Sequence, residues 1–375
     1  MKVICAPDSF KGSLTAVQAA AAMADGIQHA VADAEVDRCP VGDGGEGTLE
    51  ALLASVPGEH LGATVSDSFG RNVDATFGLL GDGRTAFVEA AAAIGLGAIP
   101  LRERDVMRAS SYGVGQLVVN ALQQCRDKII IGIGGSSSND GGCGMAQALG
   151  VRFFDRADRL IEARLTGATI SEIHRIDTAD LCHDLENKKV IVACDVINPF
   201  TGPDGAAHIF APQKGATNAQ VDELENNLLH LAELIRRDLG VDIQSTPGAG
   251  AAGGLGGGLL AFAGAELVSG IDAILEAVGF EERIQGADLC LTGEGRLDAQ
   301  SLSGKACLGV AALAAKYKVP TVALVGRAGP GAQQSLHAGI TEYVEIGGGL
   351  SEEESIRQAA SLLSNAAAAT TRKYC

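Results

Sequence analysis

The chain has no tryptophan, and aromatic residues make up only 4% of its 375 residues. This scarcity argues against an aromatic-rich binding module. The hydrophobic residues, 46% of the chain, are mostly Ala, Val, Leu and Ile, a composition that favours helices packed on sheets. A chain of this length is too long for one ordinary core, and two α/β domains are expected.

Positive charge is also scarce, because 29 Lys and Arg face 46 Asp and Glu, for a formal net charge of −17. Nucleic acid is therefore not expected as a partner, since its phosphates would be repelled over most of the surface. No apolar run approaches the length of a membrane span, so no membrane partner is expected either. A small anion remains compatible with this charge if local cations surround it, because one unpaired like-charge contact at about 4 Å costs about 4 kcal/mol.

The nine cysteines form no CxxC pair, and their number is odd. Several lie in apolar runs, among them Cys5, Cys194 and Cys290, which predicts buried free thiols rather than disulfides. A reducing compartment, the cytoplasm, is expected, and the chain opens on a predicted strand rather than on a signal peptide. The histidines show no H-x₃-H spacing, so zinc is not expected.

Glycine is abundant, with 50 residues, nearly twice its usual share of about 7%. The order of the apolar runs is typical of alternating strands and helices. Residues 63–89 instead carry short alternating runs that predict antiparallel hairpins. The remaining expected elements are strands at 2–6, 36–41, 128–133, 190–194, 288–291, 321–325 and 342–346, a helix near 113–122, and an amphipathic helix over 220–239. A further helix is expected to begin at a cap formed by Ser13 or Thr15, with Gln18 in capping-box spacing from Thr15.

These elements predict an α/β fold with one doubly wound domain made from both ends of the chain, residues 1–65 and 266–375. A mixed α/β domain, residues 66–265, is inserted between the two parts. Five segments share one pattern, in which a strand ends and a loop of glycine, small hydroxyl and acidic residues follows. They are residues 6–13, 42–48, 133–142, 193–199 and 292–298. Ligands of α/β sheets collect at the carboxyl ends of strands, so these loops are expected to converge on one crevice.

The loop 134–142 is the strongest candidate for a phosphate-binding loop. Its glycines leave backbone N–H groups accessible, its serines offer hydroxyls, and a predicted helix follows. A plain strand-to-helix turn is the alternative. The residues predicted to bind the nucleotide here are Gly134, Gly135, Ser136, Ser137, Asn139 and Asp140.

A second glycine-rich run, residues 247–258, contains Gly248, Gly250 and Gly253 in G-x-G-x-x-G spacing, with Asp272 about 20 residues beyond. The preceding run is short and polar rather than a buried first strand, so we interpret the dinucleotide match as chance. Two interpretations stay open: a flexible loop over ATP, in which Gly248 and Gly250 contact the nucleotide, and a close helix-packing surface. The sequence also lacks a P-loop.

Acidic residues at the loop starts suit magnesium, which binds carboxylates together with phosphate oxygens. Asp43, Glu46 and Glu294 are the predicted ligands, and stabilisation of a helix N-terminus is a strong alternative for Glu46.

Asp8 and Asp195 each end a buried apolar strand, and either could accept the proton of a substrate hydroxyl. Lys11 is the cation predicted to neutralise a transferring phosphoryl group. A substrate carboxylate would be bound by further basic and hydroxyl side chains. For the basic residues among them, a solvated position on the protein surface is nearly as good an interpretation. These predicted substrate-binding residues are Arg71, Arg296, Ser301 and Lys305.

At these motifs the sequence closely resembles the bacterial glycerate kinase family. The resemblance is carried by APDSFKGS (6–13), VGDGGEGT (41–48), IGIGGSSSNDGG (131–142), ACDVINP (193–199), PGAGAAGG (247–254) and LTGEGRLDAQS (291–301), which span nearly the whole chain. The resemblance implies phosphorylation of D-glycerate by Mg-ATP, with 2-phosphoglycerate as the usual product. It also implies a Rossmann-like domain, an inserted second α/β domain, and an active site in the cleft between them.

Two other functions are alternatives to this one: an NAD-dependent hydroxy-acid dehydrogenase built on 248–253, and a non-catalytic sensor of small anions. Whether the 2- or the 3-hydroxyl is phosphorylated stays open. The Ala-rich helices leave room for a homodimer.

Overall fold

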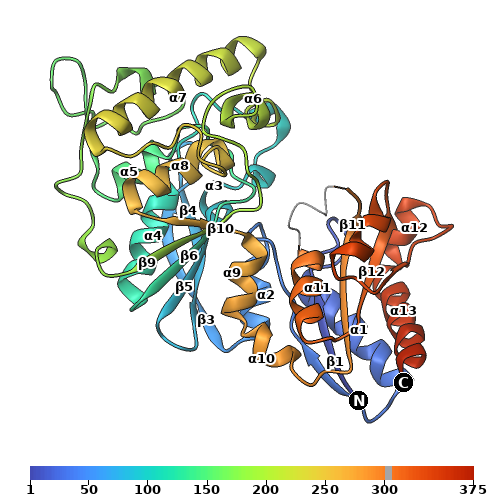
Figure 1. Cartoon of the computed structure of the whole chain (residues 1–375). Helices are drawn as coiled ribbons and strands as arrows, with labels where there is room; N and C mark the ends of the chain where they lie inside the picture. The colour runs from blue at the N-terminus through green and yellow to red at the C-terminus, as the bar shows by residue number, and fades with distance from the viewer. Residues whose placement is uncertain (300–305) are drawn as a thin grey trace. The chain divides into compact units, whose positions relative to one another are not determined.

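The computed structural model describes residues 1–299 and 306–375. The chain forms two compact units (Figure 1). Unit 1 comprises Met1–Asp43, Glu50–Pro57 and Ser269–Cys375, and unit 2 comprises Gly44–Leu49 and Gly58–Val268. The chain thus passes between the units at 43/44, 49/50, 57/58 and 268/269. The domain boundaries expected at 65/66 and 265/266 stay a prediction.

Unit 1 is built on a five-stranded sheet in which every neighbouring pair is parallel. Its strand order is β13 (Glu342–Glu345), β12 (Thr321–Ala328), β11 (Leu289–Leu297), β1 (Lys2–Pro7) and β2 (Glu35–Arg38). The chain turns from β2 on one side of β1 to β11 on the other, which gives the strand order 2-1-3-4-5 of flavodoxin-like sheets. In such sheets the ligand binds where the strand order reverses, here at the carboxyl ends of β1 and β11.

Helices cover both faces of this sheet. On one face α1 (Ala16–Ala30) lies beside α13 (Ala359–Tyr374), and Gly26 allows the close approach, since a Cβ there would lie 2.1 Å from the carbonyl oxygen of Ser364 (Figure 1). On the other face α11 (Ala306–Lys316) packs its buried side chains over β11 and β12. The capping box predicted at Thr15 and Gln18 begins α1 and is confirmed. The shorter elements of unit 1 are α9 (Gly270–Ala277), α10 (Phe280–Ile284), the 3₁₀ helix Ala332–Ala338 and α12 (Glu352–Arg357), while α2 (Thr48–Ser55) begins in unit 2 and continues into unit 1.

Unit 2 contains a six-stranded mixed sheet. Its order is β10 (Glu266–Val268), β9 (Lys189–Ala193), β6 (Lys128–Gly132), β5 (Thr85–Glu89), β4 (Asn72–Leu80) and β3 (Gly58–Ser66). β3, β4 and β5 pair in antiparallel fashion, which confirms the hairpins predicted for residues 63–89. β5, β6, β9 and β10 are parallel, so the loops after β6 and β9 leave the same edge of the sheet.

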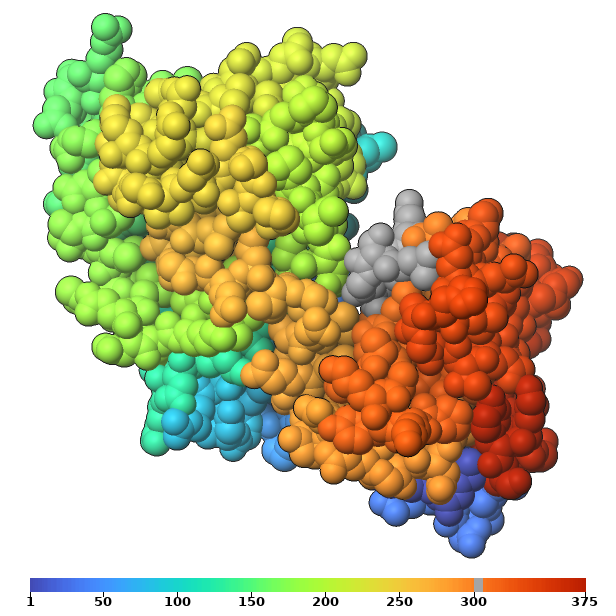
Figure 2. Space-filling model, viewed as in Figure 1, coloured from blue at the N-terminus to red at the C-terminus, as the bar shows by residue number. Residues whose placement is uncertain are grey.

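The helices of unit 2 are α3 (Ala90–Ile94), α4 (Tyr112–Gln124), α5 (Cys143–Ala148), α6 (Ala206–Phe210), α7 (Asn218–Leu239) and α8 (Ala251–Ala263). α7 buries Val221, Leu224, Leu228, Leu231 and Ile235, as its periodicity predicts, and Figure 2 shows its outer side in yellow on the surface of unit 2.

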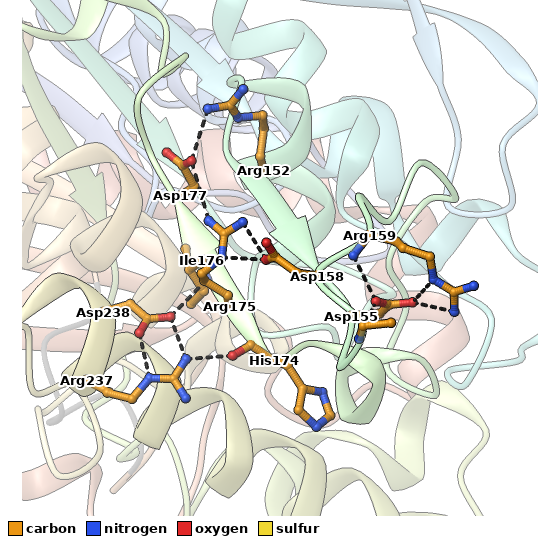
Figure 3. A network of polar contacts seen from close by, with 11 residues as sticks. Arg152, Asp155, Asp158, Arg159, His174, Arg175, Ile176, Asp177, Arg237 and Asp238 are labelled. Atoms are coloured by element: carbon orange, nitrogen blue, oxygen red, sulfur yellow. Dashed lines mark hydrogen bonds and ion pairs between the residues drawn. The ribbon is translucent and has the colours of Figure 1, made fainter.

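A two-stranded ribbon, β7 (Arg152–Phe154) and β8 (Arg175–Asp177), is fixed to the end of α7 by polar contacts (Figure 3). The carboxylate of Asp238 accepts a hydrogen bond from the Ile176 N–H at 2.9 Å, and the Arg237 guanidinium donates to the His174 carbonyl at 2.6 Å. The ion pairs of this network are largely exposed and are each worth roughly 0.2–1 kcal/mol. These contacts hold the ribbon against the end of α7.

The glycines of 247–258 lie in tight packing contacts. A Cβ on Gly258 would lie 2.6 Å from the carbonyl oxygen of Gly141, and one on Gly250 would lie 2.0 Å from that of Pro199. These contacts favour the packing interpretation of this run. Residues 241–250 form no strand, so the βαβ context that a dinucleotide fingerprint requires is absent from this part of the described chain.

Candidate active site

Unit 1 carries a pocket of about 450 Å³ at the carboxyl ends of β1, β11 and β12. This is the edge of the sheet at which the strand order reverses, the position expected for a ligand site. Its polar lining residues are Asp8, Ser9, Lys11, Ser13, Asp43, Glu294, Arg296, Arg327, Glu352 and Ser355. Two of the five predicted loops, 6–13 and 292–298, therefore meet here, together with Asp43 from a third.

Backbone pairing brings three carboxylates of this pocket together. Pro7 pairs with Gly293 in the parallel register of β1 and β11, so that Asp8 and Glu294 are the next residues on each strand. The N–H groups of Cys39 and Val41 donate to Cys5 and Pro7 at 2.8 and 3.0 Å, which continues the pairing of the chain along β1 beyond β2. Asp43 follows directly and reaches the same pocket.

The burial and the charges of the pocket change the pKa of Asp8. The pKa of Asp8 is raised from 3.8 to about 7, mainly by burial and in addition by the negative charges of Asp43 and Glu294. The Ser9 N–H, which donates to Asp8 Oδ1 at 2.6 Å, and the Lys11 ammonium oppose this shift. A carboxyl group with a pKa near 7 is suited to accept a proton at neutral pH.

The side chains of Asp43 and Glu294 in this pocket are of the chemical type that Mg²⁺ binds. A divalent cation would relieve their mutual repulsion, and Mg²⁺ binds one or two carboxylates together with phosphate oxygens and water rather than a complete protein cage. Within residues 1–299 and 306–375 no group of three or more His, Cys, Asp or Glu has metal-site geometry on its own. This pocket can therefore hold the ion only with oxygens from a bound phosphate or from water.

In unit 2 the loops after β6 and β9 and the segment 44–48 gather at one edge of the sheet. Gly132 of β6 pairs with Ala193 of β9. Gly134 and Asp195 each follow two residues after this pair, so their loops leave the sheet at the same level. A Cβ on Gly44 would lie 2.8 Å from the Ala193 Cβ, and one on Gly134 would lie 2.9 Å from the Gly45 Cα. Glycine at these positions lets the backbones touch.

The loop after β6 is held by its own side chains. The buried Asp140 carboxylate accepts hydrogen bonds from the Ser111 N–H at 2.7 Å and hydroxyl at 2.8 Å, and from the N–H groups of Gly142 and Gly144, both at 3.2 Å. The Ser137 hydroxyl donates to the Ile94 carbonyl, and the Asn139 amide donates to that of Ala206. Asp140, Ser137 and Asn139 thus shape the loop, and their predicted role toward a nucleotide stays a prediction.

Lys214, which sequence reasoning missed, lies beneath the same loop with an exposed fraction of only 2%. Its ammonium donates to the Ser138 carbonyl at 2.6 Å and to Ser136 Oγ at 3.2 Å. Burial lowers the pKa of Lys214 from 10.5 to about 7, and the negative charge of Asp140 partly opposes this shift. Nothing in the surrounding residues, Ala211 to Ala216, signals this role.

Glu89 is a second residue that sequence reasoning missed. Its carboxylate accepts a hydrogen bond from the Leu49 N–H at 2.7 Å, in the first turn of α2, and burial raises its pKa. The sequence did contain a signal for Glu89, because this residue ends an apolar strand. Asp8 and Asp195, which were predicted, directly follow apolar strands in a similar way.

Residues 3–374 match the model of the glycerate kinase family. The chain belongs to this family.

Among its relatives, a glycerate 2-kinase of Escherichia coli (strain K12) is 46% identical over 326 residues, covering 87% of this chain and 85% of that protein. A glycerate kinase of Halalkalibacterium halodurans is 42% identical over 366 residues, covering 97% and 96%. A crystal structure assigned as glycerate kinase 2 of Salmonella typhimurium LT2 matches with a TM-score of 0.88 at 39% identity, over 100% of this chain and 98% of that chain. The family membership and the mixed α/β fold expected from the sequence are confirmed.

The predicted substrate-binding residues of this glycerate kinase family member have different surroundings. Arg296 lines the unit 1 pocket and pairs with Asp298 at 2.9 Å. Arg71 lies in the turn between β3 and β4, where its guanidinium pairs with Asp67 at 2.6 Å. Ser301 and Lys305 lie outside the described residues.

Of the predicted magnesium ligands, Asp43 and Glu294 line the unit 1 pocket, whereas Glu46 belongs to the segment 44–49 of unit 2. All nine cysteines are free and six are buried, among them Cys5 and Cys290 as predicted, whereas Cys194 is only partly buried. Among the helices of the described residues, none has the length and apolarity needed to span a membrane.

The raised pKa of Asp8 predicts a pH-dependent effect of Asp8→Asn. Wild-type Asp8 favours its neutral form in the folded state, so the stability it contributes is present below about pH 4 and is lost as the pH rises through about 7. Asp8→Asn should match the wild type near pH 4 and be more stable above pH 8, by at most about 4 kcal/mol at about 1.4 kcal/mol per pKa unit. Urea unfolding at several pH values measures this difference.

The matched control for this experiment is Asp33→Asn, because Asp33 is exposed between α1 and β2. Because this side chain is exposed, the substitution should change the free energy of unfolding by no more than about 0.5 kcal/mol. An Asp8→Asn difference that does not change with pH would contradict the electrostatic description of the pocket.

Proposed function

We propose that this protein transfers the γ-phosphoryl group of ATP to a hydroxyl of D-glycerate, with ADP as the second product. Membership of the glycerate kinase family supports the reaction. The observation that carries the chemistry is the unit 1 pocket, where a proton acceptor, a cation and acidic metal ligands line one space. The expected product is 2-phosphoglycerate, in keeping with the name of the E. coli relative.

Each group in the pocket has a role in this reaction. Asp8 accepts the proton of the attacking glycerate hydroxyl, because its pKa of about 7 suits proton transfer at neutral pH. The exposed ammonium of Lys11 neutralises charge on the transferring phosphoryl group. Arg296 is the candidate to bind the glycerate carboxylate. In this role its guanidinium would either contact Asp298 and the substrate together or give up its ion pair with Asp298.

Magnesium is part of this proposal, with Asp43 and Glu294 as its protein ligands. When bound with ATP, Mg²⁺ would neutralise the phosphate oxygens and orient the nucleotide. Asp195 remains the alternative base, and the prediction that both units contribute to one active site remains a prediction. The dehydrogenase alternative is disfavoured, because no strand precedes Gly248 within 241–250.

One assay tests the function. The protein is mixed with ATP, Mg²⁺ and D-glycerate, ADP is measured, and the product is examined by phosphorus NMR. The proposal predicts glycerate-dependent ADP release and a phosphorus signal coupled to the proton on carbon 2. Tight glycerate binding without ADP release would support the anion-sensor alternative, and a signal coupled to the protons of carbon 3 would identify the 3-phosphate.

Replacement of Lys11 tests the pocket itself. Lys11→Ala should lower kcat by about 100-fold or more, since a cation that stabilises the transferring group is lost. Its melting temperature should stay near that of the wild type, because the residue is exposed. Lys316→Ala, at an exposed position on α11, is the matched control and should keep full activity. Unchanged kinetics in Lys11→Ala would remove Lys11 from the mechanism.

A further inference from the structure

The loop after β6 offers a row of hydrogen-bond donors that the fold does not use. Among the described residues, the N–H groups of Gly134, Gly135 and Ser136 have no hydrogen-bond acceptor, although their neighbours Leu96 and Ser137 pair across the adjoining strand segment. Gly135 is exposed and has a φ of +72°. A left-handed residue in such a turn directs successive N–H groups toward one side, which is the geometry of an anion-binding nest.

Lys214 determines what the Ser136 hydroxyl can do. A lysine ammonium carries only donors, so in the 3.2 Å contact with Lys214 Nζ the Ser136 oxygen must accept. The Ser136 hydroxyl can then donate a hydrogen bond of its own, and among the described residues it has no acceptor for that bond. The second ammonium bond, to the Ser138 carbonyl at 2.6 Å, holds Lys214 in this position.

We propose that Lys214 is a positioning residue that keeps the Ser136 hydroxyl a donor, so that Ser136 and the N–H groups of 134–136 bind an anionic oxygen of a substrate. The oxygen belongs either to a phosphate of ATP or to the glycerate carboxylate, since both present the same chemistry. The inference rests on the proposed function for the identity of these ligands. Lys214 also supplies the only full positive charge bonded to this loop within the described residues.

The protonation state of Lys214 switches this arrangement. A neutral amine has a lone pair and would accept a hydrogen bond from the Ser136 hydroxyl, which turns that hydroxyl from the ligand toward Lys214. The charge that acts on Lys214 is that of Asp140 on the same loop, and the Arg104 guanidinium donates to the carbonyl of the adjacent Gln213 at 2.9 Å. The titratable group of the preceding helix α6, His208, lies 3.5 Å from Glu225. Since the pKa of buried Lys214 is about 7, binding of the anion should weaken as the pH rises from 6 to 8.

Equilibrium titrations with ATP, tripolyphosphate and D-glycerate test the proposal without relying on turnover. Lys214→Met keeps the aliphatic stem and removes the charge, and it should weaken binding of one ligand class by about 10–100-fold. Loss of ATP and tripolyphosphate binding assigns a phosphate site, and loss of glycerate binding assigns a carboxylate site. In the kinetics, the KM of that substrate should rise far more than kcat falls.

Ser136→Ala provides the second variant, in case Lys214→Met does not fold. It should weaken the same ligand and abolish the pH dependence between 6 and 8. The double variant should bind no more weakly than Lys214→Met, because the lysine acts through the hydroxyl. Unchanged affinity for all three ligands in folded Lys214→Met and Ser136→Ala overturns the inference. A wild type that binds these ligands but releases no ADP contradicts the proposed function alone.

Discussion

The crowding of three carboxylates at the ends of neighbouring parallel strands is the constraint on which the unit 1 site depends. The register that pairs Pro7 with Gly293 makes Asp8 and Glu294 neighbours, and the pairing of Cys39 and Val41 with β1 adds Asp43. Burial and mutual repulsion keep the pKa of Asp8 near 7. The fold thereby holds an arrangement that is unfavourable without a counterion, and that becomes favourable when a cation enters with a polyanion.

Where unit 1 presents carboxylates, the loop after β6 in unit 2 presents hydrogen-bond donors. This loop presents backbone N–H groups, and the buried ammonium of Lys214 is bonded to it. The only carboxylate within that loop, Asp140, accepts hydrogen bonds from donors of unit 2. A protein with a net charge of −17 needs such local donors to bind an anion at all. Glycine at 44, 132 and 134 lets the neighbouring backbones touch and so keeps this edge of the sheet compact.

Much of this could be predicted from the sequence, because strand ends are visible as apolar runs that stop at an acid or a glycine. Asp8, Asp43 and Glu294 were found in this way, as were the hairpins of 63–89 and the apolar face of α7. Lys214 could not be found, since its burial arises from contacts with residues more than 70 positions away along the chain. The packing role of the glycines at 250 and 258 was equally hidden, because the backbones they touch are brought to them only by the tertiary fold.

The central claim is that Asp8 is a proton acceptor tuned by its neighbours, and its titration tests this most directly. The carboxyl carbon of Asp8 can be followed by NMR with ¹³C-labelled aspartate as the pH is varied, with an Asp8→Asn sample to assign the signal. The account predicts a midpoint near pH 7 in the free protein, displaced to lower pH when Mg²⁺ and ATP are added. A midpoint near 4 in the free protein, unaffected by these ligands, would contradict it.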